Sequence, residues 1–471
     1  MPQRRAHVAP SVAQSELAEA LAALRASLDA PVEFSPEALA EASESTAPEP
    51  EVDLRDVPFA TLDPAGSRDL DQAFHLARLG NGFEVRYAIA DVPAFVRPGG
   101  ALDAAARERG QTLYAADGSI PLHPRPLSED RASLLPDVER PALVWTFRLD
   151  EAGAVDGFRL ERALIRSRAQ LEYTSVQKAL AAGEDSPAAL LPVIGGLRQD
   201  LERERGGASL NVPDEEVLRA ADGTYSIVRR HPLPVEDWNA QLSLMTGMAA
   251  ATLMIDAGVG VLRTMPEPDA AAFDAFRHQT EALGRPWTSG GYGEYLRSLD
   301  RSDPLTLPVL EAASTLFRGA GYEVFDGSVP DGIEQAAIAA PYAHATAPLR
   351  RLVDRWSLAI CLAVSNGQDA PAWARDSLAE LPELMRASSQ RASRLNADTI
   401  NCVEAALLSP RVGERLDATV IAVREDRATV QIAEPAVTAS APLPAGAVPG
   451  DAVSLRLVRA DIAKGEVEFA L

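Results

Sequence analysis

The stretch Thr61–Leu76 reads TLDPAGSRDLDQAFHL and places three aspartates, Asp63, Asp69 and Asp71, within nine residues. If a strand begins at Asp69, its period of two puts Asp69 and Asp71 on one face, and the leucines and phenylalanine of the stretch face the core. The turn residues 64–66, Pro-Ala-Gly, can fold Asp63 back toward the same face. The stretch therefore predicts a strand that carries a cluster of carboxylates.

Three carboxylates packed together raise one another's pKa unless a cation neutralises them. Oxygen ligands of this kind suit Mg²⁺ or Mn²⁺, which bind proteins through a few carboxylates together with substrate phosphates. Two other interpretations stay open at this point, a solvated acidic turn and a calcium loop, although the acids lack the spacing of the calcium loop. The six scattered histidines give no support for a zinc site.

Alternation of apolar and polar residues continues beyond the cluster and then changes to helical periodicity. Phe83–Ile89 and Leu143–Leu149 alternate as half-buried strands do. Helices are expected around residues 238–255, 308–318, 349–364 and 377–408. Strands first and helices later predict an α+β domain, with a largely antiparallel sheet surrounded by helices.

Both ends of the chain differ from this central part. Residues 1–50 read as a short helical segment, either a helix-turn-helix remnant or a docking arm, with Leu17, Leu21, Leu24 and Leu28 at helical intervals. Ser35 is expected to cap a second helix that starts with Pro36. Five short β-type runs after residue 414 predict a small barrel of the OB or S1 type. The predicted domains are therefore 1–50, 51–408 and 409–471.

A second constellation, YAHATAPLRRLVD at Tyr342–Asp354, runs directly into an apolar helical pattern. With Thr346 or Ala347 as the cap, Arg350 and Arg351 are expected in the first helical turn. The helix dipole disfavours cations at that end, so the arrangement makes more sense around a bound anion such as a phosphate. Two arginines on a solvated helix face remain the alternative.

Taken together and in this order, the two constellations resemble the ribonuclease II (RNB) family of 3′→5′ exoribonucleases. TLDPAGSRDLDQA resembles the family's TIDPxxxxDxDDA, and YAHATAPLRRLVD resembles its YxxFTSPIRRYxD. Residues 87–96 and 106–130 carry further similarity, and the resemblance covers roughly residues 52–405. It implies an RNB catalytic domain followed by an S1-like barrel.

The resemblance also implies roles for single residues. Asp63, Asp69 and Asp71 match metal-site aspartates, with Asp71 also expected to be catalytic, whereas Gln72 stands where the family has a fourth aspartate. Arg350 matches the arginine that steadies the scissile phosphate. The expected contacts to RNA come from four residues: Tyr114, Tyr342, Thr346 and Arg351. The implied cofactor is Mg²⁺, with Mn²⁺ as an alternative, and the implied substrate is single-stranded RNA with a free 3′ end.

Composition narrows the function further. The 471 residues carry 45 Lys and Arg against 68 Asp and Glu, a net charge of −23, which argues against broad electrostatic coating of nucleic acid. Two cysteines without a CxxC pattern predict a cytoplasmic protein, and the absence of a long apolar run predicts that no segment spans a membrane. We also expect the chain to be a monomer. The rival functions are a catalytically degenerate RNB fold that binds RNA or a protein partner, and a metal-dependent phosphatase.

Overall fold

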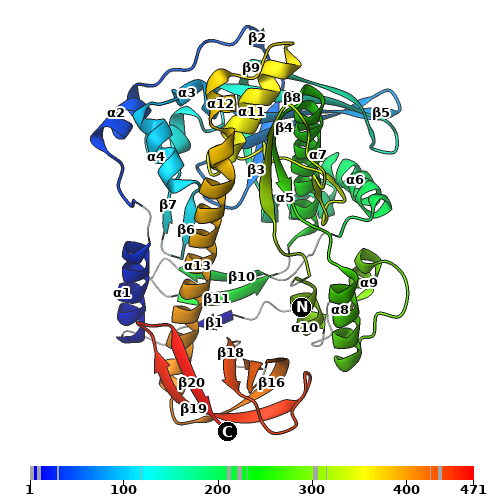
Figure 1. Cartoon of the computed structure of the whole chain (residues 1–471). Coiled ribbons are helices and arrows are strands. Elements are labelled where there is room, and N and C mark those ends of the chain that lie inside the picture. The colour runs from blue at the N-terminus through cyan, green and yellow to red at the C-terminus, as the bar shows by residue number, and fades with distance from the viewer. Residues whose placement is uncertain are drawn as a thin grey trace.

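A computed structural model of the chain describes residues 5–7, 12–28, 31–116, 118–208, 214–219, 225–230, 232–300, 306–314, 316–424, 426–432 and 437–471. Its central sheet has the strand order β2-β9-β3-β4-β5-β8, and β9 also pairs with β8. The sheet therefore closes on itself through the long strand β9 (Figure 1). The strands are β2 (Val52–Asp53), β3 (Phe59–Asp63), β4 (Gln72–Leu79), β5 (Gly82–Ala90), β8 (Glu139–Leu149) and β9 (Val155–Glu172).

The predicted largely antiparallel sheet is confirmed. Only the pairings of β9 with β2 and β3 are parallel in this sheet, and the alternating runs at 83–89 and 143–149 lie in β5 and β8. The predicted strand start at Asp69 is wrong, because β4 begins at Gln72. The Leu70 N–H donates to Ser133 Oγ at 3.0 Å, so the segment before β4 is held by a neighbouring loop rather than by a strand ladder.

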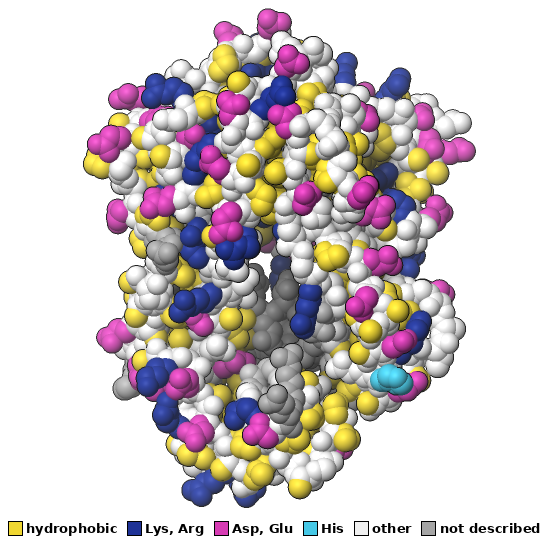
Figure 2. All heavy atoms as spheres, in the orientation of Figure 1, with side chains coloured by type: hydrophobic (Ala, Val, Ile, Leu, Met, Phe, Trp, Pro, Cys, Tyr) yellow, Lys and Arg dark blue, Asp and Glu magenta, His cyan; other side chains and the backbone are white. Residues whose placement is uncertain are grey.

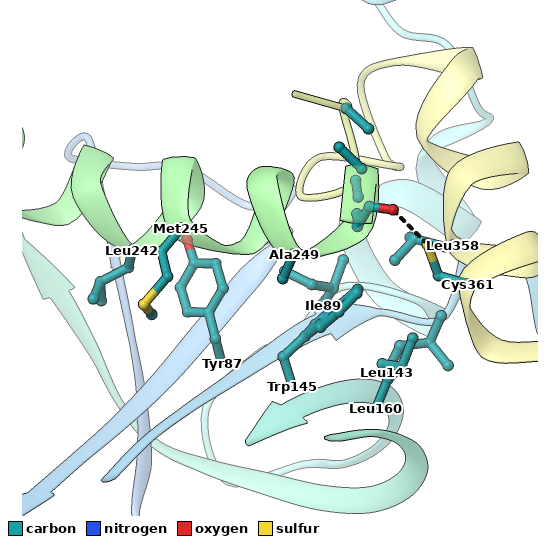
Figure 3. Close-up of a cluster of buried hydrophobic side chains, with 14 of the residues drawn as sticks. Tyr87, Ile89, Leu143, Trp145, Leu160, Leu242, Met245, Ala249, Leu358 and Cys361 are labelled. Carbon is teal, nitrogen blue, oxygen red and sulfur yellow. Dashed lines mark hydrogen bonds between the residues drawn. The ribbon is translucent and has the colours of Figure 1, made fainter. Parts of the chain in front are cut away.

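The main hydrophobic core lies between this sheet and two helices, α7 (Pro234–Ala257) and α11 (Leu352–Ser365). Figure 3 shows Tyr87 of the sheet facing Met245 of α7, and Trp145 of the sheet facing Ala249 of the same helix. Cys361 of α11 donates through its thiol to the carbonyl of Ala250 in α7, which ties the two helices together. The alternate residues of the same strands, among them several alanines, pack into a second core that includes α2 (Pro36–Glu44).

The other elements surround these two cores. The helices are α3 (Val92–Phe95), α4 (Ala101–Arg109), α5 (Tyr173–Ala182), α6 (Leu191–Arg205), α8 (Ala270–Ala282), α9 (Tyr292–Ser298), α10 (Thr306–Ser314) and α12 (Ala372–Asp376). The strands are β6 (Leu113–Ala115), β7 (Gly118–Ile120), β10 (Asp214–Arg219), β11 (Tyr225–Arg230), β12 (Val259–Thr264), β13 (Gly321–Asp326), β14 (Glu334–Gln335) and β15 (Ala340–Pro341).

The central sheet with α7 and α11 forms the main body of the molecule, and the long helix α13 (Leu381–Leu408) leads from this main body to a separate C-terminal sheet (Figure 1). This sheet has the order β18-β17-β16-β19-β20, and its edge strands β18 and β20 approach each other, so it is nearly closed. The predicted S1-like barrel is thereby confirmed. Its strands are β16 (Arg415–Arg424), β17 (Arg427–Ile432), β18 (Val437–Pro442), β19 (Ala452–Asp461) and β20 (Glu466–Ala470).

The N-terminal segment is helical as predicted, with α1 (Val12–Ser27) and α2. Ser35 caps α2, since its hydroxyl accepts from the Ala38 N–H at 3.1 Å. Leu17 and Leu21 of α1 are buried against α13 and the barrel. The sequence did not predict the short strand β1 (Arg5–His7), which pairs with β11. The visible face of the molecule is indented between the main body and the barrel, and several Lys and Arg side chains lie at the rim of this indentation (Figure 2).

Candidate active site

The acidic segment lies at one end of the central sheet. Strand β3 ends at Asp63 and the antiparallel strand β4 starts just after Asp71, so the two residues lie at the same end. The chain reverses between them through a turn in which the Ser67 N–H donates to the Pro64 carbonyl at 3.2 Å. Gly66 has a φ of +80°, a conformation that favours glycine. The turn therefore brings Asp63 back toward Asp71, as the sequence predicted.

Asp71 is buried, with 3% of its surface exposed. Its Oδ1 accepts from the Leu349 N–H at 2.8 Å, and its Oδ2 lies 3.2 Å from Arg350 Nε. Burial raises the pKa of Asp71 to about 8, although the Arg350 guanidinium and the Leu349 N–H oppose that shift. Burial therefore favours the protonated form of Asp71 even beside Arg350, and further positive charge nearby would favour the carboxylate.

Asp63 has one carboxylate oxygen, Oδ2, that is buried and accepts no hydrogen bond from any described residue. Burial raises the pKa of Asp63 to about 7, the charge of Asp69 adds to this rise, and Arg350 opposes it. Buried polar atoms are normally paired. The unpaired oxygen of Asp63 is thus available to a ligand that carries positive charge or a proton.

Arg350 lies beside this cluster with 46% of its side chain exposed, so its guanidinium reaches both Asp71 and solvent. The prediction that Arg350 and Arg351 occupy the first turn of a helix is wrong, because α11 begins at Leu352 and Arg351 is extended. The backbone of Arg351 pairs with that of Gln111 in an isolated antiparallel β-bridge. The turn before Arg351 is held by the Ala347 N–H, which donates to Asp354 Oδ1 at 2.7 Å. Backbone N–H groups that the prediction left free for an anion are therefore used by Asp71 and Asp354.

Tyr114 lies at the edge of the same site. It belongs to the short hairpin of β6 and β7, and 58% of its surface is exposed. Its hydroxyl donates to Asp69 Oδ2 at 3.4 Å. An exposed aromatic ring beside the acids suits stacking on a nucleic-acid base.

The remaining predicted RNA contacts, Tyr342, Thr346 and Arg351, are less accessible than Tyr114 and Arg350. Tyr342 and Thr346 are buried, with 7% and 3% of their surfaces exposed. The Thr346 carbonyl accepts from the side-chain amide of Gln72, and Arg351 forms a two-pronged ion pair with Asp354, with both distances 2.9 Å. The structure thus brings all the predicted residues into one region, and the contact of these three with RNA stays a prediction.

Sequence reasoning gave no role to two further residues. Asp354, fully buried, anchors both Arg351 and the Ala347 N–H. Its position at the end of the quoted constellation, next to a pair of arginines, was the available signal. Tyr173 interacts electrostatically with Asp63, and burial raises the pKa of Tyr173 to about 12. No sequence pattern identified Tyr173, because it is distant from the acidic stretch along the chain.

The carboxylates fit a divalent cation with few protein ligands. Among the described residues, no three His, Cys, Asp or Glu side chains converge as a metal-binding group. Mg²⁺, however, is commonly held by one or two carboxylates together with waters and substrate phosphates. Asp63, with its unpaired buried oxygen, and Asp71, which shares Asp69 and Arg350 as charged neighbours, meet that requirement.

Comparison with known proteins places the chain in a family. The RNB domain profile matches residues 51–360, and the profile of the RNase II-type exonuclease C-terminal S1 domain matches residues 414–471. Ribonuclease R of Escherichia coli K12 is 29% identical over 328 residues, which is 64% of this chain and 39% of that protein. The chain thus spans well under half the length of this relative.

Solved structures show the same fold. The apo form of Mycoplasma genitalium RNase R superimposes with a TM-score of 0.87 at 17% identity, covering 97% of this chain and 78% of that one. The same protein has also been solved with ribose-methylated single-stranded RNA. Yeast Ssd1, described as a pseudonuclease, aligns with a TM-score of 0.68 at 16% identity, over 88% of this chain and 52% of its own.

Proposed function

The chain belongs to the RNB family of RNase R-like 3′→5′ exoribonucleases, and on that premise we propose that it hydrolyses single-stranded RNA from a free 3′ end. The products are 5′-nucleoside monophosphates, and the reaction depends on Mg²⁺ or Mn²⁺. One observation carries the proposal: the half-exposed Arg350 lies 3.2 Å from the buried acid Asp71. The charge of Arg350 alone does not offset the effect of burial on the pKa of Asp71.

In this proposal Asp63 and Asp71 would hold the cation together with waters and a substrate phosphate. Asp69, the third predicted ligand, would join them only once the cation is bound, because the three acids do not converge as a metal-binding group in the described part of the chain. When bound, a divalent cation supplies positive charge at the scissile phosphodiester and orients the attacking water. The Leu349 N–H holds Oδ1 of Asp71, and this hydrogen bond fixes the orientation of Oδ2. Asp69 is oriented by the Tyr114 hydroxyl.

Arg350 stabilises the charge that develops on the phosphate oxygens. Its guanidinium is planar and always charged, and its exposed part can reach a phosphate while its Nε stays beside Asp71. Arg351 and Asp354 brace the turn that carries Arg350, since their ion pair and the bond from the Ala347 N–H fix both ends of it. Tyr114 stacks on a base near the 3′ end, which positions the terminal phosphodiester.

The decisive experiment is degradation of a 5′-labelled oligo(A) by the purified chain, with Mg²⁺ and, in parallel, with EDTA. Stepwise shortening that requires the metal and fails in Asp71→Asn is the expected result. Cleavage by Asp71→Asn at the wild-type rate would overturn the assignment. A phosphatase, the third alternative, would remove phosphate from small substrates and ignore RNA length.

One set of observations favours a second function, an RNA-binding protein that does not cut. Gln72 replaces an acid of the family pattern, and its amide donates to the Thr346 carbonyl, so it is committed to a structural contact. The similarity in fold to a pseudonuclease points the same way. A stable gel shift of the oligo(A) without shortening, at every Mg²⁺ or Mn²⁺ concentration, would establish this alternative.

We also propose that the chain acts in the cytoplasm as a monomer. Its two cysteines, Cys361 and Cys402, are buried and unpaired, which suits a reducing compartment. None of the helices in the described part of the chain combines the length and the apolar character needed to cross a bilayer.

A further inference from the structure

The hairpin of β6 and β7 carries Tyr114 and separates two kinds of side chain. Leu113 and Ile120, which are directly opposite each other, are buried with 1% and 3% of their surfaces exposed. Tyr114 points to the other side, where its hydroxyl reaches Asp69. The position of the tyrosine ring therefore depends on what holds the buried side of the hairpin.

The buried side is held by two helices from opposite ends of the chain. Leu113 and Ile120 form a small cluster with Leu395 of α13, and Leu28, just after α1, packs against this cluster. Ala115 of the hairpin packs against the same cluster. The hairpin is thus clamped between α13 and the end of α1.

A second set of contacts joins the hairpin to α1. Ala116 packs against the cluster that α1 shares with α13 and the barrel, a cluster that also includes Leu24. Arg25 Nη1 lies 3.7 Å from the position that a Cβ atom would occupy on Gly118, at the start of β7. The end of α1 therefore lies within van der Waals reach of the start of β7, and Ala116 adds a second apolar contact on the same side of the hairpin.

We propose that α1 is a positioning element for the active site: through Leu28 it fixes the β6–β7 hairpin so that the exposed ring of Tyr114 stays beside Asp69. This inference deepens the proposed function and rests on it, because it concerns how a terminal RNA base is held. The N-terminal segment then contributes to RNA binding without any direct contact to RNA.

The test uses the full chain in EDTA, so that RNA is bound but not cut. The probe is a single-stranded oligo(A) whose 3′-terminal base is 2-aminopurine, whose fluorescence falls when it stacks on an aromatic ring. Wild type is compared with Leu28→Asp, Leu28→Met and Tyr114→Ala. The matched control is Leu39→Asp in α2, which places the same change on a leucine that is 42% exposed. Thermal melting of each variant checks that it is folded.

The expected result is loss of quenching in Leu28→Asp and Tyr114→Ala, with normal quenching in Leu28→Met and Leu39→Asp. Affinity should fall about fivefold in Leu28→Asp, at the lower end of what one stacked base contributes. Normal quenching in a folded Leu28→Asp would overturn the inference while leaving the proposed function intact. Failure of wild type to bind the probe at all would instead refute the proposed function.

Discussion

Replacing Asp71 by Asn should make the protein more stable at pH 8 without a divalent cation, although it abolishes cleavage. In the folded chain burial raises the pKa of Asp71 to about 8, from an ordinary value of 3.8. Between these two values the folded protein keeps a proton that the unfolded chain has released. The free energy of unfolding therefore decreases as the pH rises from about 4 to about 8.

The size of the effect follows from the span between the two pKa values. Each pH unit is worth about 1.4 kcal/mol, so full ionisation of Asp71 costs at most about 6 kcal/mol. The amide that Asp71→Asn introduces stays neutral and can still accept the Leu349 N–H through its oxygen, whereas Arg350, being half exposed, can turn to solvent. A gain of about 2 kcal/mol or more is expected at pH 8 and little change at pH 4.

Urea unfolding of wild type and Asp71→Asn in EDTA, at pH 4 and pH 8, measures this difference. Added Mg²⁺ should stabilise wild type at pH 8 and should have a much smaller effect on the variant. Asp326→Asn, in an exposed pair with Arg375, is the control and should show no such pH dependence. If Asp71→Asn is less stable than wild type at pH 8 in EDTA, the claim that burial dominates the energy of Asp71 is refuted.

Three other changes test the site and its support. Arg350→Ala should lower kcat by about 10²- to 10³-fold with unchanged thermal stability, since it removes a transition-state donor that is half exposed; an unaltered kcat would exclude Arg350 from the reaction. Gln72→Asp should lower the Mg²⁺ concentration needed for half-maximal cleavage, because it adds a carboxylate to the cluster, and a metal titration measures this. Asp103→Ala should lower the free energy of unfolding in urea by about 3–5 kcal/mol, since it leaves the buried guanidinium of Arg355 without its 2.6 Å partner. Asp326→Ala, which breaks a pair on the surface, should lower it by less than about 1 kcal/mol.

The sequence predicted the fold well wherever the pattern is periodic. The strands at 83–89 and 143–149 and the five strands of the barrel alternate regularly, and each appears within a few residues of its expected position. Periodicity failed at Asp69 and at Arg350. At Asp69 a long-range hydrogen bond from Leu70 to Ser133 holds the chain in a loop, and at Arg350 a local one from Ala347 to Asp354 holds it in a turn.

The membership of the site was predictable, but its electrostatic state was not. The resemblance named Asp63, Asp71 and Arg350, and the structure brings their charges together. Sequence could not show that Asp71 is buried or that one oxygen of Asp63 has no partner among the described residues, because these properties depend on packing by distant segments. The anchoring role of Asp354 is different, because its partners Ala347 and Arg351 lie in the same short stretch of sequence.

Helix α13 has a consequence for how the molecule unfolds. Its first part, at Leu381 and Met385, belongs to the core of the main body, between the central sheet and α7 and α11. Its last part, from Cys402 to Leu408, belongs to the core that the barrel shares with α1. One continuous helix thus contributes to two cores, and neither core can lose it without exposing apolar surface. The barrel, α1 and the main body should therefore unfold as one cooperative unit. Heat that loosens the barrel should then also loosen the hairpin that carries Tyr114.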